Sequence, residues 1–282
     1  MNSSSVTTAD RSGAALPAME AEILRDSERV RAKNRVNVWT IRVGALVAVL
    51  GSWQILSSSG AVDSFFVSSP LAIVERLAEL LVEESTWTNI QATAFAALLA
   101  LGIGSALGIG CGLLFTRIPV VAKALNPYIT FLNSLPRPAL APIAILWFGL
   151  GMSSKVVVGV SIVFFILLLN TMAGLRNVDS DIATLTQSLG ASNIQRFMKV
   201  ELPTALPSIV AGLRLGATYS VLGVVVSEIV AAYDGLGTML VAATNAVDLT
   251  TSFAVLTLMA TIAVVLDMLV RILEKRVAEM HS

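Results

Sequence analysis

Six long apolar segments dominate this chain and limit what it can fold into. They cover residues 41–56, 92–115, 128–150, 156–175, 209–232 and 253–272. Most approach or exceed the roughly 20 residues that a helix needs to cross a hydrocarbon layer about 30 Å thick. Because the six segments occupy much of the 282 residues, no sizeable soluble catalytic domain fits beside them.

The composition supports the same conclusion. Hydrophobic residues make up 55% of the chain and charged residues 13%, whereas soluble domains carry about 25% charged residues. We therefore predict an all-α membrane protein with six transmembrane helices. Its expected parts are a cytoplasmic N-terminal segment (1–38), a transmembrane domain (39–276) and a cytoplasmic tail (277–282). Residues 1–35 lack the basic and then apolar order of a cleaved signal, so the first span should remain as an anchor.

The distribution of Lys and Arg predicts the orientation. An even number of spans places both termini on one side, and 16 of the 19 basic residues then fall on that side. The opposite side holds Arg76 and Lys155, and Arg137 lies inside the third span. Since basic residues in short loops stay in the cytoplasm, both termini should be cytoplasmic.

The third apolar segment cannot form one regular helix, because Pro136, Pro138 and Pro142 interrupt it. Irregular backbone at membrane depth is tolerated where it lines a cavity or is buried in protein. Arg137 lies between two of these prolines, and its guanidinium would suit an anion through paired donors. The alternative is that Arg137 snorkels or binds a carbonyl near the inner mouth.

Polar features on the predicted outer side are fewer. Residues 69–84 predict an interfacial helix that starts with Ser69 as N-cap and Pro70 at the first position. Glu228 ends the fifth span, either as a carboxylate solvated at the interface or as a gate or inter-subunit contact. A turn is expected at residues 235–237, and at the inner end of the sixth span Asp267 should pair with Arg271.

The longest inner loop, residues 177–207, predicts two short helices joined at Gly190, which suits a left-handed C-cap. Ser192 and Gln195 have the spacing of a capping box at the start of the second helix. Leu202-Pro203 should end that helix. Its apolar face, formed by Ile194, Phe197 and Met198, must either pack on the inner ends of the bundle or dock into a partner.

Several motifs resemble those of a known family. Gly190-Ala191-Ser192, followed by Val200-Glu201-Leu202-Pro203, resembles the EAA loop of ABC importer permeases. The likeness extends over about residues 65–276 and is strongest to the nitrate/sulfonate/bicarbonate (taurine) branch. Its other motifs are 136–142, 146–151, 205–207, 212–216, 225–228 and 235–237. This resemblance implies the MetI-like architecture of type I importer permeases.

The resemblance also assigns roles to residues. Where the family has Glu-Ala-Ala, this chain has Thr184, Leu185 and Thr186, so the acidic residue is missing. The residues implied in coupling to an ATPase are Thr184, Leu185, Gly190, Ala191, Ser192, Ile194, Phe197, Leu202 and Pro203. The residues expected on the translocation pathway are Pro136, Arg137, Pro138 and Glu228.

The implied mechanism is alternating access in a bacterial inner membrane. Two copies of the permease would form the pathway for a small anionic solute, which a periplasmic or lipid-anchored binding protein delivers. Two separate ATP-binding subunits would bind ATP and Mg²⁺, so this chain would bind no cofactor or metal and would not be an enzyme. The sequence leaves open the solute and whether the pair is homomeric.

Two other classes remain as alternatives. A self-contained secondary carrier or channel would have an internal repeat and several intramembrane carboxylates, of which the spans offer Glu228 and Asp267. An intramembrane enzyme would need a nucleophile with a base or metal ligands. It is disfavoured because the one histidine, His281, lies in the tail.

Overall fold

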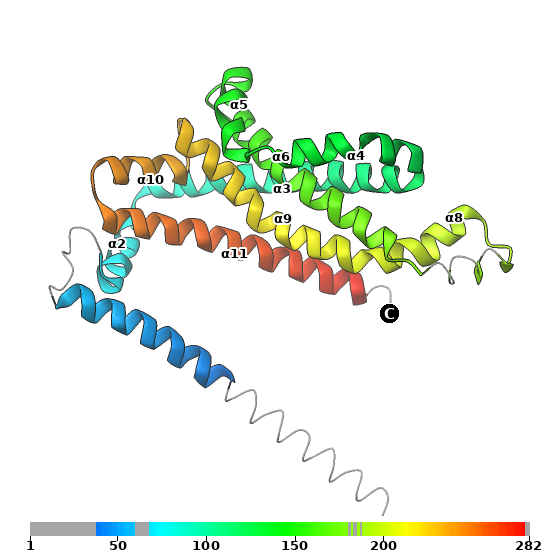
Figure 1. Cartoon of the computed structure of the whole chain (residues 1–282). Coiled ribbons are helices and arrows are strands. Elements are labelled where there is room, and N and C mark those ends of the chain that lie inside the picture. Colours follow the sequence, from blue (N-terminus) through cyan, green and yellow to red (C-terminus); the bar gives the residue numbers. More distant parts are fainter. Residues whose placement is uncertain (1–37, 60–67, 180–181, 183–184, 187, 280–282) are drawn as a thin grey trace, which may run out of the picture. The chain divides into compact units, whose positions relative to one another are not determined.

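The computed structural model describes residues 38–59, 68–179, 182, 185, 186 and 188–279, which form helices and turns with no strand among them (Figure 1). The chain divides into two compact units, Met1–Pro70 and Leu71–Ser282. In the first unit the structure describes mainly one helix, Val38–Ser58. Nearly all of the predicted N-terminal segment lies outside the described residues.

Five helices in the described part are long and apolar enough to cross a membrane. They are Val38–Ser58, α3 (Glu84–Arg117), α6 (Met152–Arg176), Asn193–Val230, which ends in α9 (Leu202–Val230), and α11 (Leu249–Glu279). A bent pair of helices makes a sixth candidate span. The prediction of a helical membrane protein with six spans is thus confirmed.

The bent pair is the segment that the prolines were expected to break. It consists of α4 (Pro119–Asn133), the 3₁₀ turn η1 (Arg137–Ala139) and α5 (Leu140–Phe148), and the two arms meet at 80°. The backbone leaves the helical conformation at Pro136, which is extended at φ −66° and ψ 109° and has no N–H to continue the hydrogen bonds of α4. Helix α4 begins at Pro119, earlier than the predicted start of this segment at Tyr128, because proline is well suited to the first position of a helix.

Glycines allow α3, α6 and α9 to pack at close range in the second unit (Figure 1). A Cβ added to Gly108 of α3 would lie 2.8 Å from the Leu167 Cβ of α6. Between α6 and α9, a Cβ on Gly223 would lie 2.8 Å from the Gly159 Cα. In lipid there is no hydrophobic driving force between helices, so they associate through close packing, and small residues allow the helix backbones to approach.

The described residues of the segment 177–207 lie at one end of this bundle, which we call the inner end, and the opposite end is the outer end (Figure 1). The outer end carries α2 (Pro70–Val82) and α10 (Leu236–Asn245). Helix α2 begins at Pro70 as predicted and buries Ile73 and Leu80. The Arg76 Nε of α2 donates to the Thr251 hydroxyl of α11 at 2.9 Å, which ties α2 to the bundle.

Candidate functional site

The inner segment has the turn and the cap that its sequence predicts. Gly190 has φ +77°, a left-handed conformation that favours glycine. The Gln195 N–H donates to the Ser192 Oγ at 3.2 Å, and the Ser192 N–H donates to the Gln195 Oε1 at 2.9 Å. The capping box therefore satisfies two backbone donors at the start of α8 (Asn193–Arg196). Thr184, expected in coupling, lies outside the described residues.

The second helix of this segment does not end at Leu202-Pro203, so that prediction is wrong. Helix α8 continues through a π turn, η2 (Phe197–Glu201), directly into α9. The Leu202 N–H donates to the Phe197 carbonyl, five residues back. The wider turn shifts the hydrogen-bond register, so that Pro203 falls in the first turn of α9, where a missing N–H is tolerated. We call the described residues of 177–207 the docking segment, and from Asn193 onward it is a direct extension of a spanning helix.

The apolar residues of the segment divide between two surfaces. Phe197 and Leu202 pack on the inner ends of the helices, against the buried Leu175, Ala205 and Ile209. Ile194 remains 75% exposed and Leu189 77% exposed. We call the exposed apolar set the docking strip, and it consists of Ile182, Leu185, Leu189, Ile194 and Met198. The structure therefore places Phe197, expected to dock, on the bundle side, and it leaves the docking strip exposed.

An ionic clamp holds the docking segment to the end of α3. The Arg117 Nη2 lies 3.5 Å from the Glu201 Oε2, and the Arg196 Nε lies 2.8 Å from the Glu201 Oε1. The Arg117 Cζ lies 4.0 Å from the centre of the Phe197 ring, within the range of a cation–π contact. The sequence does not predict this clamp, because Arg117 is far along the chain from Arg196, Phe197 and Glu201 and forms no local pattern with them.

Arg137 stands in the bend between α4 and α5 and is half-buried. Its Nη1 donates to the Ser161 carbonyl of α6 at 3.2 Å, and its Nη2 donates to the carbonyl and Oδ1 of Asn133 at 3.2 Å. Its Cζ lies 4.5 Å from the Phe165 ring centre. The guanidinium has no carboxylate partner among the described residues, and its contacts there are with two carbonyls, an amide oxygen and an aromatic ring. The carbonyl contacts agree with the alternative expected from the sequence.

A hollow of about 450 Å³ opens near the inner end, between the end of α3, the first half of α4 and the end of α6. Lys123 and Arg176 line it, and neither forms an ion pair with a described residue. Its other lining residues are Phe115, Thr116, Ala122 and Asn126. Cations that lack an ion-pair partner in the described part of the chain therefore lie both at the bend and at this hollow.

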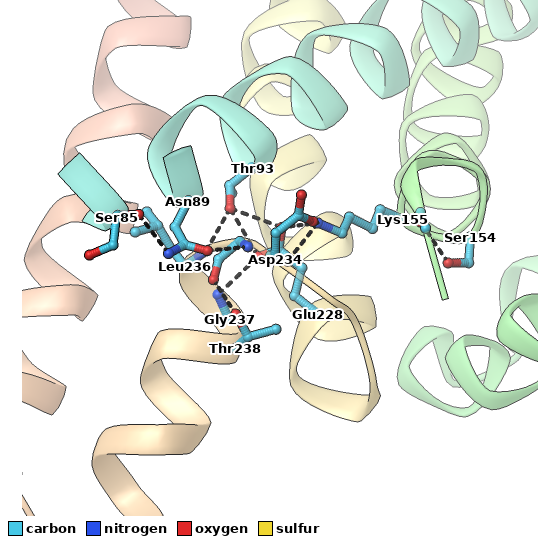
Figure 2. Close-up of polar contacts among 12 residues, drawn as sticks. Ser85, Asn89, Thr93, Ser154, Lys155, Glu228, Asp234, Leu236, Gly237 and Thr238 are labelled. Atoms are coloured by element: carbon cyan, nitrogen blue, oxygen red, sulfur yellow. Dashed lines mark hydrogen bonds and ion pairs between the residues drawn. The ribbon is translucent and has the colours of Figure 1, made fainter. Parts of the chain in front are cut away.

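The outer end contains a buried polar cluster around Glu228, which Figure 2 shows. Glu228 is 1% exposed, which corrects the prediction of a carboxylate solvated at the interface. The Thr93 hydroxyl of α3 lies within donating distance of both carboxylate oxygens, at 2.9 and 3.0 Å. The Gly237 N–H of α10 donates to Oε2 at 2.9 Å. The carboxylate thereby joins α3, α9 and α10.

Lys155 supplies the positive charge of this cluster. Its side chain is 0% exposed, although its position predicted an outer loop residue. The ammonium donates to the carbonyl and Oδ1 of Asp234 at 2.7 and 2.6 Å, and it lies 3.2 Å from the Glu228 Oε1. These contacts satisfy its three N–H donors, and the Asp234 side chain is 50% exposed. The cluster carries two carboxylates for one ammonium, with one of them in contact with solvent.

The turn at residues 235–237 fits around Glu228, as the expected glycines allow. Gly235 has φ +112°, and an added Cβ there would meet the Glu228 carboxylate. The Gly235 N–H donates to the Asn89 Oδ1 at 2.6 Å, and the Leu236 N–H donates to the Thr93 hydroxyl at 2.8 Å. The sequence predicted this turn, but it did not place Glu228 and Lys155 inside it.

At the inner end, the predicted pair between Asp267 and Arg271 is confirmed at 2.7 Å. The Arg214 Nε of α9 also lies 3.4 Å from the Asp267 carboxylate, so the pair links α9 to α11. The described residues contain no group of three or more His, Cys, Asp or Glu that could hold a metal ion. The clusters are suited to holding helices together and to contacting charged partners.

These features define a class of protein, and comparison with known sequences identifies the family. A family model for the inner membrane component of binding-protein-dependent transport systems matches residues 104–279. Because this match covers more than half of the 282 residues, the chain belongs to that family. It is a multi-pass permease subunit of ABC importers, as the motifs of residues 190–207 predicted.

Three curated relatives show the range within the family. The putative aliphatic sulfonates transport permease SsuC of Bacillus subtilis is 29% identical over 83% of this chain and 85% of its own length. The taurine transport permease TauC of Escherichia coli is 29% identical, with 86% and 90% covered. The riboflavin transport permease RibX of Chloroflexus aurantiacus is 30% identical, with 90% and 95% covered.

Two solved structures share the fold. The MetNI methionine ABC transporter in inward-facing conformations matches with a TM-score of 0.55 at 19% identity, over 67% of this chain and 97% of that one. An amino acid ABC transporter with histidines matches with a TM-score of 0.57 at 16% identity, over 73% and 97%. The predicted architecture of an ABC importer permease is confirmed.

Proposed function

We propose that the docking strip is the surface on which a separate ATP-binding subunit acts. The observation that carries this proposal is an exposed apolar strip on a segment that continues without a break into the spanning helix α9. Exposed apolar patches mark interaction sites. A push on the strip would reach the bundle directly, because Phe197 and the Arg117–Glu201 clamp hold the segment to it.

Co-purification tests this proposal. Ile194→Asp places a charge in the strip, whereas Asn193→Asp places the same charge on the neighbouring exposed residue. We expect the permease, co-expressed with the ATP-binding subunit of its transport system, to lose that subunit in the Ile194 variant and to retain it in the Asn193 variant. Equal retention by both variants would contradict the assignment.

The complete transporter would contain two copies of the permease, two ATP-binding subunits and an extracytoplasmic binding protein. ATP and Mg²⁺ would bind in the partner subunits, and this chain would bind no cofactor. The basic residues of the loops support cytoplasmic termini in a bacterial inner membrane. Because Cys111 is the single cysteine, cysteines introduced at positions 193 and 233 of a Cys111→Ala variant would report sidedness. Labelling of position 193 from outside the cell would contradict this orientation.

We infer that the solute carries an anionic group and passes the bend at Arg137 and the hollow near the inner end. Arg137 lies at the bend without a carboxylate partner among the described residues, and Lys123 and Arg176 line the hollow. The transport systems for aliphatic sulfonates and taurine to which two relatives belong support this inference, because both solutes carry a negatively charged sulfonate group. Arg137→Ala should lower transport while the ATP-binding subunit stays bound, and unchanged transport kinetics would refute this role.

A further inference from the structure

Helices α3 and α9 are joined to each other at both ends. At the inner end, Arg117 at the end of α3 contacts Glu201, the residue before α9. At the outer end, Thr93 of α3 donates to Glu228 near the end of α9. Each junction contains an ion pair, Arg117 with Glu201 at the inner end and Lys155 with Glu228 at the outer end, and the side chains of both pairs are at least partly shielded from water. The two contacts are separated by most of the length of each helix.

Between these two junctions, α6 packs closely against both α3 and α9 at their glycines. Gly104 and Gly112 of α3 abut Val163 and Thr171 of α6, where an added Cβ would lie 2.7 Å from each Cβ. On the other side, Gly223 of α9 abuts Gly159 of α6. Closely packed interiors resist continuous deformation and transmit displacement. The three helices should therefore move as one block when either end is displaced.

Each junction also holds an element outside the block. The inner junction holds the docking segment, because Arg117 covers the Phe197 ring and Glu201 binds Arg196. The outer junction holds the turn before α10, because Thr93 accepts from the Leu236 N–H while it donates to Glu228. Figure 2 shows how this turn is enclosed by side chains from α3, α6 and α9.

We propose that α3 and α9 form one strut in which Arg117 positions the docking segment and Thr93 with Glu228 positions the outer turn. Displacement of the docking segment by the ATP-binding subunit is carried along the strut to the outer turn, and a binding protein at the outer end acts on the inner end in return. This inference rests on the proposed function. Linkage requires such coupling of binding equilibria to be reciprocal.

The test is a double-mutant cycle in the assembled transporter, reconstituted in proteoliposomes with its binding protein. Arg117→Gln opens the inner junction, and Thr93→Val opens the outer one with little change of shape. Each variant should lower the stimulation of ATP hydrolysis by the binding protein at least about fivefold, the lower end of usual coupling between sites. Basal hydrolysis and subunit composition should stay as in the unmodified complex. The double variant should lose no more stimulation than the more impaired of the two single variants, because opening either junction already interrupts the transmission along the strut.

Matched controls separate this role from simple stability. Arg271→Gln removes another inner arginine with an ion pair, outside the strut, and Thr93→Ser keeps the hydroxyl group. Both should retain full stimulation. If Thr93→Val does not assemble, Asn89→Ala takes its place, because it removes the contact to the Gly235 N–H of the outer turn together with a contact to Ser85 within α3, and it leaves the Thr93 hydroxyl intact.

Three results would overturn the strut. These are unchanged stimulation in the single variants, independent losses that multiply in the double variant, and loss of the ATP-binding subunit from the Arg117→Gln complex. The last result would mean that Arg117 supports docking alone. Failure of the proposed function would look different, because the unmodified chain would then neither retain an ATP-binding subunit nor respond to a binding protein.

Discussion

At the scale of single residues, the outer cluster shows how a membrane helix accommodates charge. A charged side chain in a span is costly unless it faces a partner or a cavity. Glu228 and Lys155 are both buried and form an ion pair with each other. Glu228 also accepts hydrogen bonds from Thr93 and Gly237, and Lys155 donates to Asp234. The cluster is therefore a joint between helices.

Removing the ammonium should destabilise this joint strongly. Lys155→Met leaves Glu228 buried without a cation, and breaking a buried pair typically costs about 3 to 5 kcal/mol. Asp234→Asn is the matched comparison, because Asp234 is half exposed and such pairs contribute about 1 kcal/mol or less. Thermal unfolding of the detergent-solubilised protein should show a far larger loss for Lys155→Met. Similar losses for the two variants would contradict the burial of the pair.

Asp248 should make part of the stability depend on pH. The Thr251 hydroxyl donates to its carboxylate at 2.6 Å and the Thr251 N–H at 2.9 Å. These contacts, first the hydroxyl and then the backbone N–H, hold the pKa of the Asp248 carboxyl below its ordinary value of 3.8. A depressed folded pKa gives stability that is complete above the unfolded pKa and is lost as the pH falls through the folded one.

Asp248→Ala should therefore cost about 1 kcal/mol near neutral pH, the usual value of a helix cap, and less at an acid pH below the ordinary carboxyl pKa of 3.8. Asp248→Asn keeps an oxygen acceptor and removes the titrating group, so it should lose less at neutral pH. Unfolding midpoints measured at the two pH values check both expectations. An equal effect of Asp248→Ala at both would rule out a contribution from the ionised cap.

At the scale of elements, the spans were predictable because apolar length and helical structure go together in lipid. The bend followed from Pro136 and Pro138, and the inner turn followed from Gly190 and the Ser192 cap. The π turn was not predictable, because a register shift depends on how Phe197 and Leu202 pack on the bundle.

The contacts between elements could not be predicted from the sequence either. Arg117 meets Glu201 across 84 positions and Lys155 meets Glu228 across 73, from the numbering of the pairs. No local pattern records such pairing. The sequence therefore predicted the docking segment and the outer turn as motifs, while the side chains that fix them in place became visible only in the folded chain.

Two glycines of α3 give a test of helix packing. An added Cβ on Gly108 would lie 2.8 Å from Leu167, whereas the space around Gly110 is open within 4 Å. Gly108→Ala should destabilise the protein by about 1 to 3 kcal/mol through overpacking. Gly110→Ala should be neutral or slightly stabilising, because Ala favours a helix. Thermal unfolding of the two variants decides, and equal midpoints would mean that α3 does not approach α6 as described.

At the scale of the whole molecule, the second unit, residues 71–282, is a block of helices with a distinct surface at each of its two ends. The inner end presents the docking strip, and the outer end presents the turn held by Glu228. Arg137 contacts this block through the Ser161 carbonyl and Phe165, so movement of the block would change the surroundings of this cation. In the proposed function, an ATP-binding subunit that acts on one end would thereby alter the path of the solute.

The most direct test of this account is photocrosslinking from inside the docking segment. A photoreactive residue in place of Ile194, which is exposed, should form an adduct with the ATP-binding subunit of the assembled transporter. The same residue in place of Phe197, which packs on the bundle, should react within the permease instead. Adducts with the ATP-binding subunit from position 194 alone are the predicted result, and their absence from position 194 in an actively transporting complex would contradict the central claim.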